Sequence, residues 1–202
     1  AFGYYSLIAN TTGAENTGVG YEVLDANTTG GSNVAVGSRA LSANTTANYN
    51  VAIGKSALAV NTTASYNVAV GKSALAANTT GQQNTATGFN ALTATTTGSG
   101  NVGIGLRAID SGTTASYNVA LGADTLSSIT TIGYQTALGS YALTASTTGE
   151  HNTAVGYATL YSNTTGSYNT ALSYKGLFTN TTGSSNTAAG YQALRDSTTA
   201  SN

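Results

Sequence analysis

The sequence repeats itself every 17 residues along its whole length. Asn-Thr-Thr begins at Asn10, Asn27, Asn44, Asn61 and Asn78, and Thr-Thr recurs at the same spacing as far as residues 198–199. No insertion or deletion interrupts the period. We number the repeat from that asparagine, so that Asn10 and Asn27 both stand at position 1. A period this strict indicates that each copy is one structural step stacked on the next.

The pattern within one copy favours a parallel β-solenoid. It reads N-T-T-G-x-x-N-(V/T)-A-(V/I/L)-G-x-x-A-L-x-x, which is too short for a pair of helices of about 34 residues. Positions 8–10 favour extended chain, and the glycines and threonines around them are turn signals. We therefore predict an all-β fold of about twelve coils, each with two short strands and two turns. At about 4.8 Å per coil the rod would be roughly 55–60 Å long.

The repeat also defines the domain. All 202 residues belong to one repeat domain, residues 1–202, and the period starts at position 9 and stops at position 6. We expect this segment to be a fragment of a longer chain, cut within a repeat at both ends.

Composition argues against several classes of partner. Charged residues make up 6% of the chain, the net charge is -1, and the six basic residues are scattered, so no patch exists that could neutralise phosphates. We therefore predict no nucleic-acid partner. No apolar run is as long as a membrane span, and none is predicted. The hydrophobic fraction of 40% is nevertheless high enough for a folded core.

Residues that carry chemistry are scarce and do not recur together. His151 is the only histidine, the chain has no cysteine, and the seven acidic residues fall at different repeat positions. Carboxylate-pair catalysis needs a matched pair at fixed separation, and zinc sites need characteristic ligand spacing. We predict no catalytic site, no cofactor and no metal, and hence no enzyme.

Position 9 is the most restrictive position in the repeat, because it accepts only alanine or glycine. Side chains alternate along a strand, so position 9 faces away from positions 8 and 10. If positions 10 and 15 pack together as the core of the coil, position 9 lies on a second crowded face that another chain must cover. The alternative is that position 9 points into a tight coil interior and position 8 points outward. The first interpretation predicts a subunit interface formed by Ala35, Ala52, Ala69, Ala86, Ala120, Ala137, Ala154 and Ala171.

Asparagine at position 7 is expected to form amide ladders from coil to coil, and the Asn-Thr-Thr turn can bond to nearby backbone. Asn-Thr-Thr is also an acceptor pattern for N-glycosylation, so the same asparagines admit a second interpretation.

Aromatic residues gather at two positions and rarely occupy both in one coil. This exclusion suggests that positions 6 and 12 share space, either within a coil or across a boundary between chains. The plain interpretation is surface packing, and the sharper one is a strip that contacts glycans or a receptor. Its members would be Tyr49, Tyr66, Tyr117, Tyr134, Tyr168, Tyr157, Tyr174 and Tyr191.

These motifs resemble two groups of known repeats. The segments NVAIG at residues 50–54 and NVAVG at residues 33–37 and 67–71 are similar to the head repeats of YadA-like trimeric autotransporter adhesins. The longer form NTAVGYATLYSNTTGSYNTAL, at residues 152–172, resembles repeats of the NTAVGYxAL type in phage tail fibres and bacterial surface proteins. The resemblance covers the whole chain and implies a left-handed β-roll and a homotrimer. YadA-type repeats are usually shorter, so an outer turn is expected to differ.

The sequence thus favours a structural role outside the cell. We expect the shaft or head of a trimeric surface adhesin or phage tail fibre, which projects a tip for attachment and contacts a glycan or receptor on a host surface. Two alternatives stay open: a self-assembling extracellular filament or matrix subunit, and a monomeric ice-binding solenoid with regular threonine columns.

Overall fold

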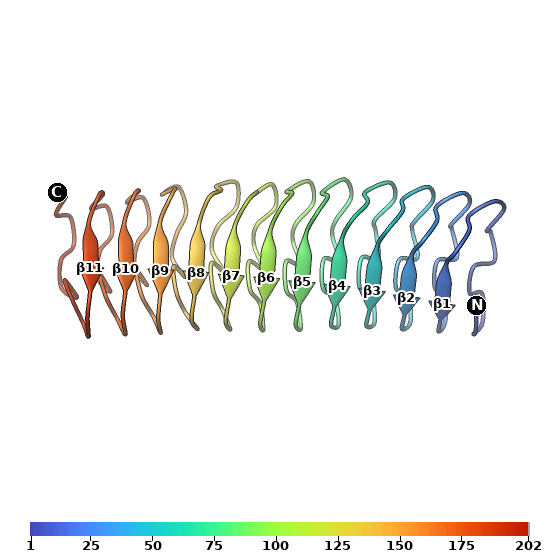
Figure 1. The fold of residues 1–202 in the computed structure, drawn as a ribbon, viewed down its shortest axis with the longest axis horizontal. Helices are drawn as coiled ribbons and strands as arrows, with labels where there is room; N and C mark the ends of the chain where they lie inside the picture. Colours follow the sequence, from blue (N-terminus) through green and yellow to red (C-terminus); the bar gives the residue numbers. More distant parts are fainter. Residues whose placement is uncertain (202) are drawn as a thin grey trace.

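The chain forms one rod of stacked coils, with one short strand in each coil (Figure 1). The computed structural model describes residues 1–201. All eleven strands are parallel and lie in a single sheet in chain order. They are β1 Thr17–Val19, β2 Val34–Val36, β3 Val51–Ile53, β4 Val68–Val70, β5 Thr85–Thr87, β6 Val102–Ile104, β7 Val119–Leu121, β8 Thr136–Leu138, β9 Thr153–Val155, β10 Thr170–Leu172 and β11 Thr187–Ala189.

The register of the sheet is the sequence period. Val51 pairs with Val68 and Ala52 with Ala69, and Phe2 forms a further parallel bridge to Val19 ahead of β1. In Figure 1 the strands lie in front and run downward while the chain advances from right to left, so the coil is left-handed. The all-β parallel solenoid predicted from the sequence is confirmed.

The prediction of two strands per coil is wrong. Only positions 8–10 form a strand, and the remainder of each coil is a succession of turns and bends. Backbone hydrogen bonds still join those turns along the rod: the Leu58 N–H donates to the Ala74 carbonyl at 3.0 Å, and the Thr28 N–H donates to the Thr45 carbonyl at 2.9 Å. The return path is therefore bonded to its neighbours without being a second sheet.

The core is a thin column of small side chains around a line of leucines. Position 15 is fully buried from Leu24 through Leu177, and the small residue at position 14 is buried beside it. Position 9 closes the column from the sheet side: a Cβ added at Gly103 would lie 3.1 Å from the Leu92 Cγ of the preceding coil. Each fully buried leucine stabilises the fold by about 1.5–3 kcal/mol relative to an exposed one.

The predicted subunit interface at position 9 is wrong, because these side chains lie inside their own coil. All eight alanines have no accessible surface in the single chain, and they belong to the continuous core. The expectation that position 10 packs against position 15 is wrong for the same reason. Positions 8 and 10 form the outer face of the sheet, as the alternative interpretation required. The residues corrected are Ala35, Ala52, Ala69, Ala86, Ala120, Ala137, Ala154 and Ala171.

Two rows of buried asparagines run along the rod. At position 7 the side-chain oxygen of each residue accepts the backbone N–H of the next, as in Asn84 to Asn67 at 3.0 Å, and Gln135 keeps this link with Asn152 at 3.1 Å. At position 1 the amides bond directly, as in Asn78 Nδ2 to Asn61 Oδ1 at 2.9 Å. The predicted asparagine ladders are confirmed.

The turns require unusual backbone conformations. Positions 6, 13 and 15 lie in the left-handed region, with φ between 47° and 65°, even though they carry tyrosine, serine or leucine. Position 11 has a still less common backbone conformation. Gly71 has φ +134°, and a Cβ there would lie 2.3 Å from the Gly88 carbonyl oxygen of the next coil. Only glycine combines that φ with so close an approach of two backbones.

Replacing Gly71 with alanine should therefore destabilise the rod by about 2–4 kcal/mol, because strain at φ +134° adds to a backbone clash. A lower urea midpoint, followed by far-ultraviolet circular dichroism, would check this. Ser173→Gly is the control at the same repeat position: Ser173 does not have a positive φ, and its buried hydroxyl makes no hydrogen bond within residues 1–201. We expect this change to lower the free energy of unfolding by no more than the entropic cost of a glycine, about 1 kcal/mol. An unchanged midpoint in Gly71→Ala would show that the turn adapts.

Candidate binding surfaces

The outer face of the sheet is an apolar strip that runs along the rod. In every strand the middle residue is buried and the two flanking residues are half-buried or exposed. Position 10 is valine, isoleucine or leucine in most coils, and Leu121 and Leu172 expose 45% and 49% of their surface. Position 8 is valine or threonine in every strand, and it is threonine from β8 to β11. The strip is flat and regular, because its residues come from one in-register sheet.

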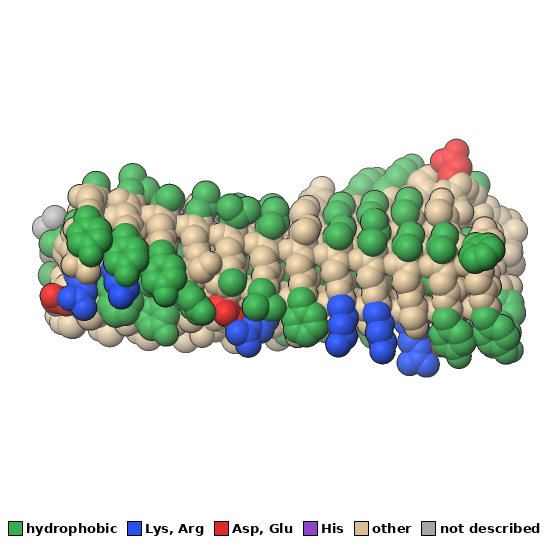
Figure 2. All heavy atoms as spheres, turned by 90° about the horizontal axis from the view of Figure 1, so that it is seen from below, with side chains coloured by type: hydrophobic (Ala, Val, Ile, Leu, Met, Phe, Trp, Pro, Cys, Tyr) green, Lys and Arg blue, Asp and Glu red, His purple; other side chains and the backbone are tan. Residues whose placement is uncertain are grey.

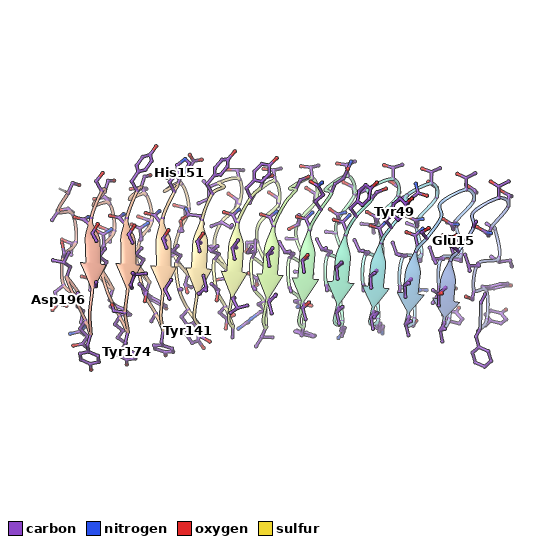
Figure 3. The ribbon with its side chains drawn as sticks, in the orientation of Figure 1. Glu15, Tyr49, Tyr141, His151, Tyr174 and Asp196 are labelled. Atoms are coloured by element: carbon purple, nitrogen blue, oxygen red, sulfur yellow. The ribbon has the colours of Figure 1, made fainter. Side chains whose placement is uncertain are left out.

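The first aromatic row lies on the edge of the rod that the chain reaches just before each strand, the upper edge in Figure 3. Rings at position 6 stack coil upon coil: Tyr49 on Tyr66 at 5.2 Å, and Tyr117 on Tyr134 at 5.5 Å between centroids. Offset aromatic stacks of this spacing are favourable. These tyrosines are all exposed, so the row presents ring edges to solvent.

His151 belongs to this row, which the sequence analysis did not anticipate. Its ring stacks between Tyr134 and Tyr168, at 5.1 Å from each. The repeat could have predicted this contact, because His151 stands at position 6 like the tyrosines. The only histidine of the chain is thus a member of an aromatic stack.

The second aromatic row lies on the opposite edge, where Figure 3 shows Tyr141 and Tyr174. At position 12, Tyr157 stacks on Tyr174 and Tyr174 on Tyr191, each at 5.5 Å. The two rows therefore do not share space within a coil, and that alternative is wrong. The other alternative, that they share space across a boundary between chains, stays a prediction. The eight tyrosines predicted as one strip divide into Tyr49, Tyr66, Tyr117, Tyr134 and Tyr168 on the upper edge and Tyr157, Tyr174 and Tyr191 on the lower edge.

The lower edge also carries most of the charge. Figure 2, which views this edge directly, shows Lys and Arg side chains beside hydrophobic ones along much of its length. Ion pairs link neighbouring coils at position 13: Arg39 to Glu22 at 2.8 Å, and Arg107 to Asp124 at 2.7 Å. Partial burial raises the pKa of the Asp110 carboxyl nearby.

Two adjoining hollows open on this edge between β6 and β10. One, of about 370 Å³, is lined by charged and hydroxyl side chains, among them Arg107, Asp110 and Asp124. The other, of about 250 Å³, is lined mainly by aromatic rings and Lys175. Tyr141 and Tyr161 border both. Neither tyrosine was predicted from the sequence as a contact residue, because positions 13 and 16 vary from coil to coil and each is aromatic in only two coils.

The Asn-Thr-Thr asparagines are enclosed by the fold. Asn27, Asn44 and Asn61 have no accessible surface, and their amides bond along the position 1 row. A glycan on such an amide nitrogen would remove a donor that the row uses. The folded coil therefore disfavours modification at these sites, while Asn10 is only half-buried.

Two kinds of feature are absent from the described residues, 1–201. No helix there is long and apolar enough to span a bilayer. Nor do three or more histidine, aspartate or glutamate side chains come together in a way that could hold a metal ion.

Comparisons with known proteins complete the description of these surfaces. No model of a known protein family, no curated protein and no solved structure matches this chain.

Proposed function

We propose that this chain is a structural segment of an extracellular fibre, the shaft or head of a trimeric surface adhesin or phage tail fibre. The observation that carries the proposal is the half-exposed apolar strip on the outer face of the sheet, which has an apolar residue at position 10 of every strand except β5, where Thr87 stands. A single-chain rod leaves these side chains half in water, whereas a bundle of parallel rods would bury them. That the bundle has three chains is inferred from the resemblance of the repeats to YadA-like heads and tail fibres.

The geometry supports parallel association of identical copies. Every coil presents the same two columns at the same spacing, so copies aligned along their axes match at every step. In Figure 2 the sheet face lies along the upper rim, where hydrophobic side chains follow one another along the rod. The lower edge, with its charges and aromatic rings, is then free to contact a surface beside the fibre.

The mass of the chain in solution tests this proposal. Light scattering is expected to give three times the mass of one chain. The double substitution Ile104→Glu/Leu121→Glu, which places charges on the strip, should reduce it to the mass of one chain while the circular dichroism spectrum is retained. Lys72→Glu, on the lower edge, is the matched control and should leave the trimer intact. A folded monomer at every concentration would contradict the proposal.

The two alternative functions predict other outcomes. A self-assembling filament would give masses that grow without limit rather than a closed oligomer. An ice-binding solenoid would be monomeric and would show thermal hysteresis. One observation weakens that alternative: position 2 hydroxyls donate to the backbone of the next coil, as in Thr28 Oγ1 to the Thr45 carbonyl at 3.1 Å, so they are already engaged.

A further inference from the structure

We propose that the aromatic hollow on the lower edge, between β8 and β10, binds a short glycan through a carboxylated sugar ring. The hollow is lined by Tyr141, Tyr157, Ala158, Tyr161, Lys175 and Phe178. The proposal deepens the attachment role in the proposed function, but it does not depend on the trimer, because all of these residues come from one chain.

A missing side chain creates the hollow. Position 13 carries Tyr141, Ala158 and Lys175 in three successive coils, all in the left-handed backbone conformation. In-register coils stack about 4.8 Å apart, so Tyr141 and Lys175 stand about 10 Å from each other with only a methyl group between them. Ala158 is 97% buried below the neighbouring side chains and forms the floor.

Aromatic rings wall the hollow with fixed orientations. Tyr161 stacks on Phe178 at 5.2 Å with an interplanar angle of 10°, while Tyr141 meets Tyr157 edge-on at 5.7 Å and 81°. Rings held by such neighbours present preformed surfaces, which lowers the entropic cost of binding. A pyranose places its C–H groups against aromatic faces and leaves its hydroxyls at the rim, where phenol and hydroxyl groups can bond them.

The cation selects an acidic sugar over a neutral one. Lys175 Nζ lies 5.3 Å from the ring centroids of both Tyr174 and Phe178, which hold the ammonium beside the hollow. Within residues 1–201 no carboxylate pairs with it at 4.0 Å or less. Its charge is therefore available to a ligand carboxylate. The adjoining polar hollow, with Arg107, Asp110 and Ser127, offers donors and acceptors for the hydroxyls of a second ring.

The repeat indicates that the fold does not require the side chains that line the aromatic hollow. Residues that a solenoid needs recur in every coil. Aromatic residues occur at position 16 only in Tyr161 and Phe178, and at position 13 only in Tyr5 and Tyr141. Departures at two repeat positions, 13 and 16, thus come together at one place on the surface.

Titration with methyl β-glucuronide, followed by ¹⁵N chemical shifts, tests the proposal. The neutral methyl β-glucoside is the matched ligand, since it differs only in carrying a hydroxymethyl group in place of the carboxylate. We expect shift changes confined to residues around 141–178, with the glucuronide bound about fivefold more tightly, as expected for one partly exposed charge contact. Lys175→Met should remove that preference, so that the variant binds the two sugars with equal affinity.

Filling the hollow should abolish binding of both sugars. Ala158→Gln does so with a side chain that Gln192 already carries at the same position and with the same sign of φ, so the coil should stay folded. Ser73→Gln, at position 13 of a distant coil, is the control and should bind normally. The proposal is overturned if neither sugar shifts these resonances, or if Ala158→Gln binds the sugars like the unsubstituted chain. It is also overturned if hexaglutamate competes with the glucuronide as effectively as added unlabelled glucuronide, because the site would then recognise only negative charge. Loss of sugar binding would leave the trimer mass unaffected, so the two proposals fail separately.

Discussion

Replacing Ala120 with glutamate is expected to unfold the coils around β7 and to lower the free energy of unfolding by about 5 kcal/mol or more. Ala120 has no accessible surface, and its methyl group faces the buried leucine column. A carboxylate at this point loses its hydration without gaining a partner, and its extra atoms also overpack the core. Urea denaturation followed by circular dichroism would measure the loss.

The neighbouring change, Leu121→Glu, is the matched control. Leu121 lies in the same strand but on the outer face, where 45% of its surface is exposed. We expect its effect on the unfolding of one chain to be about 1 kcal/mol or less. If Ala120→Glu folded normally and only dissociated an oligomer, the assignment of position 9 to the coil interior would be wrong.

Replacing Asn67 with leucine should lower the free energy of unfolding by about 2–4 kcal/mol. Asn67 Oδ1 accepts the Asn84 backbone N–H at 3.0 Å, and its Nδ2 donates to the Gly81 carbonyl at 2.9 Å. Leucine has similar volume but makes neither bond, so a buried N–H group is left without its acceptor. A lower urea midpoint, with faster hydrogen exchange at Asn84, would be the result.

Asn67→Gln separates the hydrogen bonds from the packing. Gln135 occupies the same position naturally and bonds both the Asn152 N–H and the Gly149 carbonyl. We therefore expect Asn67→Gln to retain most of the stability that Asn67→Leu loses. Equal losses in the two variants would mean that side-chain shape, rather than the hydrogen bonds, makes asparagine necessary here.

The sequence was sufficient for the fold because a strict period leaves one arrangement of neighbours. Stacking coils of 17 residues puts Ala52 beside Ala69 and Asn67 beside Asn84, and both follow from the spacing alone. The sequence did not determine which face of the strand points into the coil. Alternation distinguishes Ala120 from Val119 and Leu121, but it is the same whichever set is buried. The mixture of valine and threonine at position 8 was the better signal, because a half-exposed position tolerates a hydroxyl.

The candidate binding surfaces divide in a similar way. The tyrosine rows follow from the repeat, because equal positions must stack, and His151 could have been included on that ground. The aromatic hollow could not be predicted from the 17-residue period. Tyr141 stands at position 13, whereas Tyr161 and Phe178 stand at position 16 of later coils, and the turns of positions 12–16 bring them together only in three dimensions. Its floor depends on the absence of a side chain at Ala158.

The hydrogen bonds that join each coil to the next run along the rod, and this has a mechanical consequence. A force applied between the ends loads first the coil-to-coil bonds nearest the pulled terminus, and bonds such as those from Leu58 to Ala74 and from Asn84 to Asn67 would open one after another as the force reaches them. The rod would therefore resist stretching until a terminal coil detaches, and each detached coil would release about 50 Å of extended chain. Under load such a segment would lengthen in equal steps from its ends and act as a tether that yields gradually without breaking.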